Sequence, residues 1–157
     1  GCIAISLAKK LPFAEIVAID VSHEALKVAG MNVQKHGVAD RVHLQQSDLL
    51  KGVSGQFDVI VANLPYIGEK KFNFVSREAR EYEPHVALFG GDDGLVLYKK
   101  LFQQIIDYDI KSALVLGEFG FLQGDEMRQI LNTYFVQDNW RIQEDLAHIE
   151  RIFVVEM

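Results

Sequence analysis

Strand and helix patterns alternate along almost the whole of this 157-residue chain, and this alternation constrains the fold more than any other feature. Apolar strand patterns occupy four segments, residues 15–20, 41–46, 57–63 and 112–119. Helical patterns occupy four others, residues 1–11, 23–36, about 95–106 and about 122–133. Because alternating strands and helices form parallel sheets with helices on both faces, we expect an α/β fold with a mostly parallel twisted sheet. The last two strand patterns, WRIQEDL and RIFVVEM, predict a C-terminal antiparallel pair.

The spacing of apolar residues predicts which faces of these elements are buried. A four-residue spacing in the first helix places Ile3, Leu7 and Leu11 on one face. In the helix near residues 95–106, the shared face carries Leu95, Tyr98, Phe102 and Ile105. Residues 57–63 are nearly all apolar, which is typical of a strand covered on both faces. The pattern of residues 64–93 predicts a loop-like insertion instead, since it contains two prolines and ends near GGDDG.

Helix ends carry residues that favour capping. Ser22 is a suitable N-cap for the second helix, and Gly37 is a suitable stop. Asp92 or Asp93 is expected to cap the helix that begins near Leu95.

Length and composition restrict the class of protein. A chain of 157 residues suits one domain with a sizeable core. The formal net charge of −6 argues against a long footprint on a nucleic-acid backbone. One cysteine and five scattered histidines give no recognisable metal-ligand spacing, and no apolar run reaches the roughly 18 residues of a membrane span. The chain begins inside a helical pattern, so we expect residues 1–157 to be an N-terminally truncated catalytic domain that lacks its first strand.

Polar residues follow three of the predicted parallel strands. Ligands of open α/β sheets bind beyond the carboxyl ends of the strands. The segments expected at that edge are Asp20-Val21, Ser47-Asp48-Leu49 and Asn63-Leu64-Pro65-Tyr66. They predict one ligand-binding crevice.

Two carboxylates predict the nucleoside half of this crevice. In dinucleotide-binding folds an acidic residue about 20 positions after the glycine loop binds the ribose hydroxyls. Asp20 has this position if Gly1 is the last glycine of the loop. Asp48 is placed to accept a hydrogen bond from the exocyclic amine of adenine, with Leu49 against the ring. The alternative for Asp20 is a solvated carboxylate that helps to cap the next helix.

The Asn63-Leu64-Pro65-Tyr66 segment fits the recognition of a planar NH2 group. The Asn63 side-chain carbonyl and a backbone carbonyl next to Pro65 offer two acceptors, and proline restricts the backbone that carries the second. Such acceptors orient the nitrogen toward an electrophilic methyl group and stabilise its developing positive charge. Tyr66 offers a ring for stacking on an amide or a base. A simple strand-ending turn is the alternative, since Asn and Pro are common turn residues.

The sequence resembles the HemK/PrmC protein-glutamine N5-methyltransferases over essentially the whole chain. The resemblance rests on FDVIVANLPYI and EAREYEPHVALFGGDDGLVLYKKL, where the family has a strand ending in Asn-Pro-Pro-Tyr. It continues through GCIAISLA, AIDVSHEALKVAGMNVQKHG, Glu118-Phe119-Gly120 with Gln123-Gly124, and DLAHIERI. The stretch from Tyr82 to Leu95 is the most family-specific part and points to the release-factor branch rather than the ribosomal-protein branch.

This resemblance implies a Rossmann-like class I methyltransferase that uses S-adenosylmethionine. Its implied substrate is the glutamine amide in the Gly-Gly-Gln loop of peptide-chain release factors, in the cytoplasm. By motif, Asn63, Pro65 and Tyr66 are the implied catalytic residues that hold the amide. The implied cofactor-binding residues are Gly1, Asp20, Val21, Asp48, Leu49 and Asn63, the last near the methyl group. Leu64 departs from the family, which has proline there.

Two other functions stay open at this point. Adenine-N6 methyltransferases acting on RNA or DNA also hold an amino group with Asn-x-Pro-aromatic segments, after flipping the base. The acidic charge and the absence of a basic patch with interleaved aromatic residues in the sequence argue against that function. A methyltransferase fold that serves only as a binding scaffold is the second alternative, favoured by Leu64 alone.

Overall fold

The computed structural model describes residues 1–136 and 139–157. It contains two compact units, residues 1–53 and residues 54–157. The expected α/β fold is confirmed, with parallel pairs and a C-terminal antiparallel pair. Within the units, the described strands form one two-stranded and one four-stranded sheet. A single domain over residues 1–157 stays a prediction.

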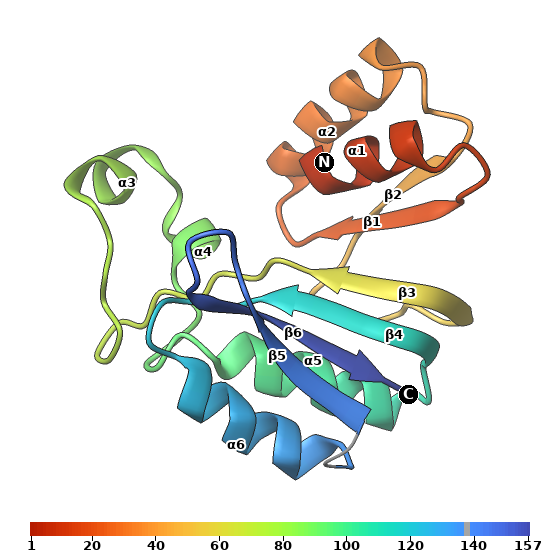
Figure 1. The fold of residues 1–157 in the computed structure, drawn as a ribbon. Helices are drawn as coiled ribbons and strands as arrows, with labels where there is room; N and C mark the ends of the chain where they lie inside the picture. Colours follow the sequence, from red (N-terminus) through yellow and green to blue (C-terminus); the bar gives the residue numbers. More distant parts are fainter. Residues whose placement is uncertain (137–138) are drawn as a thin grey trace. The chain divides into compact units, whose positions relative to one another are not determined.

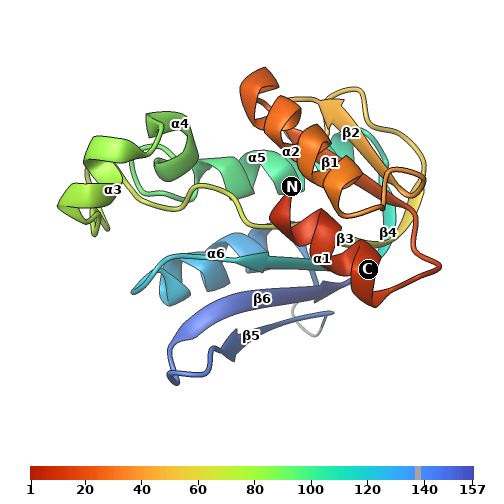
Figure 2. The same cartoon turned by 90° about the horizontal axis from the view of Figure 1, so that it is seen from above.

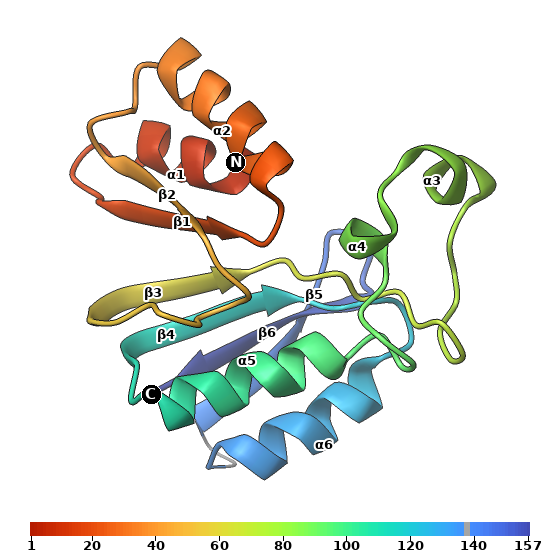
Figure 3. The ribbon, with the colours of Figure 1, turned by 180° about the vertical axis from the view of Figure 1, so that it is seen from behind.

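Unit 1 is a two-stranded parallel sheet with two helices. Its elements are α1 (Cys2–Lys10), β1 (Ile16–Asp20), α2 (His23–Lys35) and β2 (Val42–Gln46). Both helices lie on the same side of the sheet, as Figures 1 and 3 show. The core forms where Ala4, Ile5 and Ala8 of α1 meet Val33 of α2, with Ile16, Ala18, Val42 and Leu44 of the strands beneath.

The packing face of α1 differs from the one expected. Ile3 and Leu11 are 44% and 52% exposed, whereas Ala4 and Ala8 are buried. Small side chains on the inner face allow α1 to approach the sheet closely. Within unit 1, the large apolar residues at helical spacing therefore do not mark the face that packs against the sheet.

The ends of α2 follow the prediction. The Ser22 hydroxyl accepts a hydrogen bond from the Ala25 N–H at 3.2 Å. Gly37 has a φ of +65° just after the helix, in the left-handed region that glycine adopts without strain.

Unit 2 is a four-stranded mixed sheet in the order β3-β4-β6-β5. The strands are β3 (Gln56–Ala62), β4 (Lys111–Glu118), β5 (Trp140–Glu144) and β6 (Glu150–Glu156). The helices α5 (Val96–Asp107) and α6 (Gly124–Tyr134) lie together on one face of this sheet (Figures 1 and 3). The predicted apolar face of α5 is confirmed, since Leu95, Tyr98, Phe102 and Ile105 are at most 1% exposed.

Within unit 2, helices cover one face of β3, and the predicted cover of its other face stays a prediction. Val59 and Val61 are 46% and 44% exposed. Helices α5 and α6 cover one face of this sheet, and β3 is its edge strand.

Residues 64–93 contain two short helices that the sequence did not predict, α3 (Arg77–Tyr82) and α4 (His85–Leu88). The Ser76 hydroxyl caps α3 by accepting the Ala79 N–H at 3.1 Å. Figures 1 and 2 show both helices beyond the carboxyl ends of β3 and β4. The segment returns alongside the residues after β3, where the Gly90 N–H donates to the Ile67 carbonyl at 2.9 Å. None of the helices in the described ranges is both long and apolar enough to span a bilayer.

Candidate active site

The segment Asn63–Tyr66 lies at the carboxyl end of β3, next to the end of β4. Ala62 pairs with Gly117 in the parallel ladder, so Asn63 and Glu118 follow neighbouring positions of the two strands. Asn63 is exposed. Within the described residues, neither the Asn63 side-chain amide nor the Leu64 carbonyl makes a hydrogen bond. Both are therefore available to a ligand.

Tyr98 supports this segment from the core. Its side chain is fully buried, and its hydroxyl accepts the Leu64 N–H at 3.2 Å. The same hydroxyl donates to the Glu118 carbonyl and lies 3.5 Å from the Ala62 carbonyl. Burial raises the pKa of Tyr98, so the phenol stays protonated and remains a donor. One side chain thus connects the ends of β3 and β4.

Tyr66 is held at its hydroxyl and along its ring. The hydroxyl donates to Glu118 Oε1 at 3.1 Å. The Arg151 guanidinium lies 5.7 Å from the ring centroid and donates to the Phe119 carbonyl at 3.3 Å. Burial and the nearby Glu118 carboxylate raise the pKa of Tyr66, and Arg151 opposes them. The ring is consequently a neutral surface in a fixed orientation.

Gln123 fixes the backbone of Tyr66. It is fully buried just before α6. Its Nε2 donates to the Tyr66 carbonyl at 2.7 Å and to the Asp93 carbonyl at 3.1 Å. Its Oε1 accepts the Gly120 N–H at 2.7 Å. A single amide joins three segments that are far apart in the sequence.

Two glycines allow the returning chain to pass close to the Asn63–Tyr66 segment. A Cβ on Gly90 would lie 2.2 Å from the Pro65 carbonyl oxygen. A Cβ on Gly94, whose φ is +76°, would lie 2.1 Å from the Tyr66 carbonyl oxygen. Only glycine leaves room for this close approach.

Asp93, one of the two predicted capping residues, binds the start of α5. Its Oδ1 accepts the Leu95 N–H at 2.9 Å, and its Oδ2 lies 2.7 Å from Lys99 Nζ. Partial burial raises the pKa of Asp93, but the hydrogen bonds from Lys99 and Leu95 outweigh it and the net pKa is lowered.

The other predicted site residues belong to unit 1. Asp20 pairs with Gln46 at the ends of β1 and β2. The Gln46 side chain donates to the Val21 carbonyl at 3.0 Å, so the loops after the two strands lie together as predicted. Asp20 Oδ1 accepts the Ser22 N–H at 2.8 Å, and the residue is exposed. The capping alternative for Asp20 is thus seen, and binding of a ribose diol stays a prediction.

Asp48, Leu49 and Gly1 complete the predicted nucleoside residues. Asp48 is exposed, and Leu49 is half-buried with a φ of +56°. Gly1 precedes α1, and a Cβ there would lie 3.0 Å from the Cβ of Ala29 in α2. Exposed carboxylates beside an apolar side chain fit the hydroxyls, amine and ring of an adenosine.

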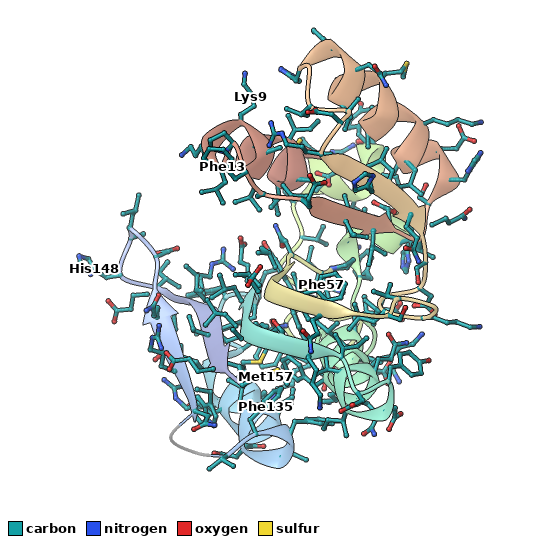
Figure 4. The ribbon with its side chains drawn as sticks, turned by 90° about the vertical axis from the view of Figure 1, so that its right-hand side faces the viewer. Lys9, Phe13, Phe57, Phe135, His148 and Met157 are labelled. Carbon is teal, nitrogen blue, oxygen red and sulfur yellow. The ribbon has the colours of Figure 1, made fainter. Side chains whose placement is uncertain are left out.

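An open hollow of about 830 Å³ lies elsewhere in unit 2. It is lined at the start of β3 and β4 by residues that include Phe57 and Met157, both labelled in Figure 4. Ligands of open α/β sheets bind at the carboxyl ends of the strands, and these are the amino ends of β3 and β4. The chemistry of Asn63–Tyr66 therefore identifies the candidate site better than the size of this hollow.

Sequence reasoning missed the residues that hold the segment in place. The apolar pattern places Tyr98 only on a core face, the resemblance alone points to Glu118 and Gln123, and no sequence feature indicates a role for Arg151. Their contacts join positions between 20 and 57 residues apart, and no local pattern encodes such pairs.

Comparison with known proteins shows what the chain is similar to. The profile of the methyltransferase small domain matches residues 1–82. A release factor glutamine methyltransferase from Koribacter versatilis is 35% identical over 98% of this chain and 54% of its own length. A ribosomal protein uL3 glutamine methyltransferase from Neisseria meningitidis is 37% identical over 76% of the chain and 39% of its own length. The N-terminal domain of human METTL16, solved with SAH, has a TM-score of 0.64 at 15% identity, covering 99% of this chain and 56% of that one. The chain therefore has a methyltransferase fold and spans about half the length of the first of these relatives.

Proposed function

This chain belongs to the methyltransferase small domain family, and we propose that it methylates the side-chain amide of glutamine in the Gly-Gly-Gln loop of peptide-chain release factors. The methyl donor in this proposal is S-adenosylmethionine. The observation that carries the proposal is the Asn63–Tyr66 segment. It offers two free carbonyl acceptors at a strand end and is fixed from behind by buried side chains.

The chemistry needed for this reaction matches those acceptors. An amide nitrogen is a weak nucleophile because its lone pair is delocalised. The Asn63 Oδ1 and the Leu64 carbonyl accept its two hydrogens, orient the nitrogen and stabilise positive charge as the N–C bond forms. Tyr66 places a neutral ring against the amide plane. After transfer, the surplus proton passes to water, so no strong base is needed.

The cofactor is assigned to the residues predicted from the sequence. Gly1, Asp20, Val21, Asp48 and Leu49 hold the adenosine part, and Asn63 lies next to the methyl group. When bound, S-adenosylmethionine supplies an electrophilic methyl group and leaves as S-adenosylhomocysteine. The exposed carboxylates of Asp20 and Asp48 support this assignment.

Fewer observations support the choice of release factors as the protein substrate than support glutamine as the methylated residue. Both relatives named above are glutamine methyltransferases, one of release factors and one of ribosomal protein uL3. We assign release factors because the 82–95 stretch resembles that branch and because that relative matches 98% of the chain. A role in translation termination in the cytoplasm follows from this assignment.

The test is transfer of labelled methyl groups by the complete gene product that carries this chain. A release factor, the same factor with Gln→Ala in its Gly-Gly-Gln loop, ribosomal protein uL3, and ribosomal RNA serve as substrates. We expect label on the unaltered factor only. Label on uL3 would move the substrate to the other branch, and label on RNA alone would replace the glutamine function with adenine methylation.

Two matched variants connect the activity to the segment. Asn63→Ala removes one acceptor, and a loss of transfer of about 100-fold or more is expected. Asn132→Ala removes an exposed amide on α6 and should leave transfer unchanged. Equal activity in both variants would contradict the role of Asn63.

A further inference from the structure

Residue 64 is the position at which the Asn63–Tyr66 segment most needs a restraint. The proposed acceptors are the Asn63 side chain and the Leu64 carbonyl, on either side of the Asn63–Leu64 peptide bond. Pro65 fixes its own φ and restricts the ψ of the residue before it. Leucine at position 64 leaves its own φ free and adds an N–H that requires a partner.

The Tyr98 hydroxyl is that partner. It accepts the Leu64 N–H at 3.2 Å and donates to the carbonyl of Glu118, which ends β4. The tyrosine itself cannot move easily. It is fully buried, with its ring centroid 5.3 Å from that of Phe153 in an edge-on arrangement and 6.2 Å from that of Phe102. Leu64 is therefore connected through one hydroxyl to the centre of the unit 2 core.

We propose that Tyr98 is a positioning residue whose hydroxyl, through the Leu64 N–H, fixes the peptide bond that lies between the two acceptors. This inference rests on the proposed function, because the acceptors have their role only if an amide binds there. A purely structural Tyr98 would contribute ring packing and nothing to the orientation of the acceptors. Phenylalanine at position 98 separates the two roles, since it keeps the ring and removes the hydroxyl.

Four forms of the complete gene product test the inference: the unaltered protein, Tyr98→Phe, Leu64→Pro, and the double variant. Tyr98→Phe should lower kcat by between about 10- and 100-fold, with little change in KM, since a misplaced acceptor affects the reacting geometry. Leu64→Pro removes the N–H and restricts φ directly. In the double variant it should therefore restore most of the kcat lost in Tyr98→Phe. Tyr108→Phe, at the exposed end of α5, is the matched control and should change neither kcat nor KM.

Amide hydrogen exchange at Leu64 gives a readout that does not depend on catalysis. Exchange should become at least about 10-fold faster in Tyr98→Phe than in the unaltered protein or Tyr108→Phe. Unchanged exchange in Tyr98→Phe overturns the inference, whatever the substrate. A kcat loss that Leu64→Pro does not restore overturns it too, because ring packing or another contact is then responsible. If the unaltered protein transfers no methyl group to a release factor, the proposed function fails, and the exchange result alone decides whether Tyr98 restrains Leu64.

Discussion

At the scale of single residues, Gln123 shows how much one buried side chain controls. Its Nε2 faces the carbonyls of Tyr66 and Asp93, and its Oε1 faces the Gly120 N–H. Only an amide satisfies all three partners, because two of them are acceptors and one is a donor. The position is fully buried, so no water can replace a lost partner cheaply.

Gln123→Glu changes one atom and should destabilise the protein in a pH-dependent way. An ionised carboxylate would face two carbonyl oxygens in the core, which costs roughly 2–4 kcal/mol. Burial raises the folded-state pKa of such a glutamate above its unfolded value. The loss in the free energy of unfolding should be complete at neutral pH. It should shrink as the pH falls through that raised pKa, since the protonated acid can donate a hydrogen bond again.

Urea unfolding of this variant at several pH values measures the effect. Gln129→Glu, at an exposed position of α6, is the control and should lie within about 0.5 kcal/mol of the unaltered protein at every pH. A deficit in Gln123→Glu that does not depend on pH would show that Gln123 acts by shape and not by donating hydrogen bonds.

The sequence predicts where the residues of the site lie along the chain, but it does not predict their distant contacts. The position of Asn63–Tyr66 after β3 was predicted, because an apolar run followed by Asn and Pro indicates where a strand ends. The partners Glu118 and Tyr98 were not predicted, because their contacts with the segment depend on how β3, β4 and α5 pack.

At the scale of elements, the long helices and the strands were predicted within one or two residues. Helix α2 was expected at 23–36 and is observed at His23–Lys35, and β4 was expected at 112–119 and is observed at Lys111–Glu118. Helices α3 and α4 were missed because they span 6 and 4 residues, too few to show a helical period. The strand order β3-β4-β6-β5 was beyond prediction, because periodicity contains no information on which strands are neighbours.

The close approach of the turn before α5 to the end of β3 yields an element-scale prediction. Gly94→Ala forces a φ of +76° on alanine and places a Cβ 2.1 Å from the Tyr66 carbonyl oxygen. Strain at this φ costs about 1–2 kcal/mol, and the contact should add about 1–3 kcal/mol more. The activity proposed for Tyr66 should fall together with stability, since its backbone must shift.

Gly52→Ala is the control that has the backbone strain without the close contact. Gly52 has nearly the same φ, +75°, and nothing lies within 4 Å of the added Cβ. Thermal unfolding should therefore show the smaller loss for Gly52→Ala and the larger one for Gly94→Ala. Equal losses would mean that backbone strain accounts for both and that the close approach to Tyr66 has no energetic weight.

At the scale of the whole molecule, the two units have cores of very different size. Unit 2 buries large aromatic and aliphatic side chains among themselves, including Tyr98, Phe102, Phe119 and Phe153. The core cluster of unit 1 consists mainly of alanine and valine with Ile5. A core of small residues in about 50 residues is rarely enough for independent stability.

Residues 54–157 expressed alone should therefore fold cooperatively, whereas residues 1–53 alone should not. Near-ultraviolet circular dichroism and urea unfolding of the two fragments measure this difference. A single cooperative transition is expected for residues 54–157, and none is expected for residues 1–53. Loss of fixed tertiary structure in the larger fragment would show that its aromatic core depends on the first 53 residues.

The central claim is that the Asn63–Tyr66 segment presents a glutamine amide for methylation, and localisation of the methyl group tests it most directly. A release factor is incubated with S-adenosylmethionine and the complete gene product, and tandem mass spectrometry locates the modified atom. We predict one methyl group on the side-chain nitrogen of the glutamine in the Gly-Gly-Gln loop, and a yield lower by about 100-fold or more when the enzyme carries Asn63→Ala. A methyl group on any other residue, or an unchanged yield with Asn63→Ala, would contradict the claim.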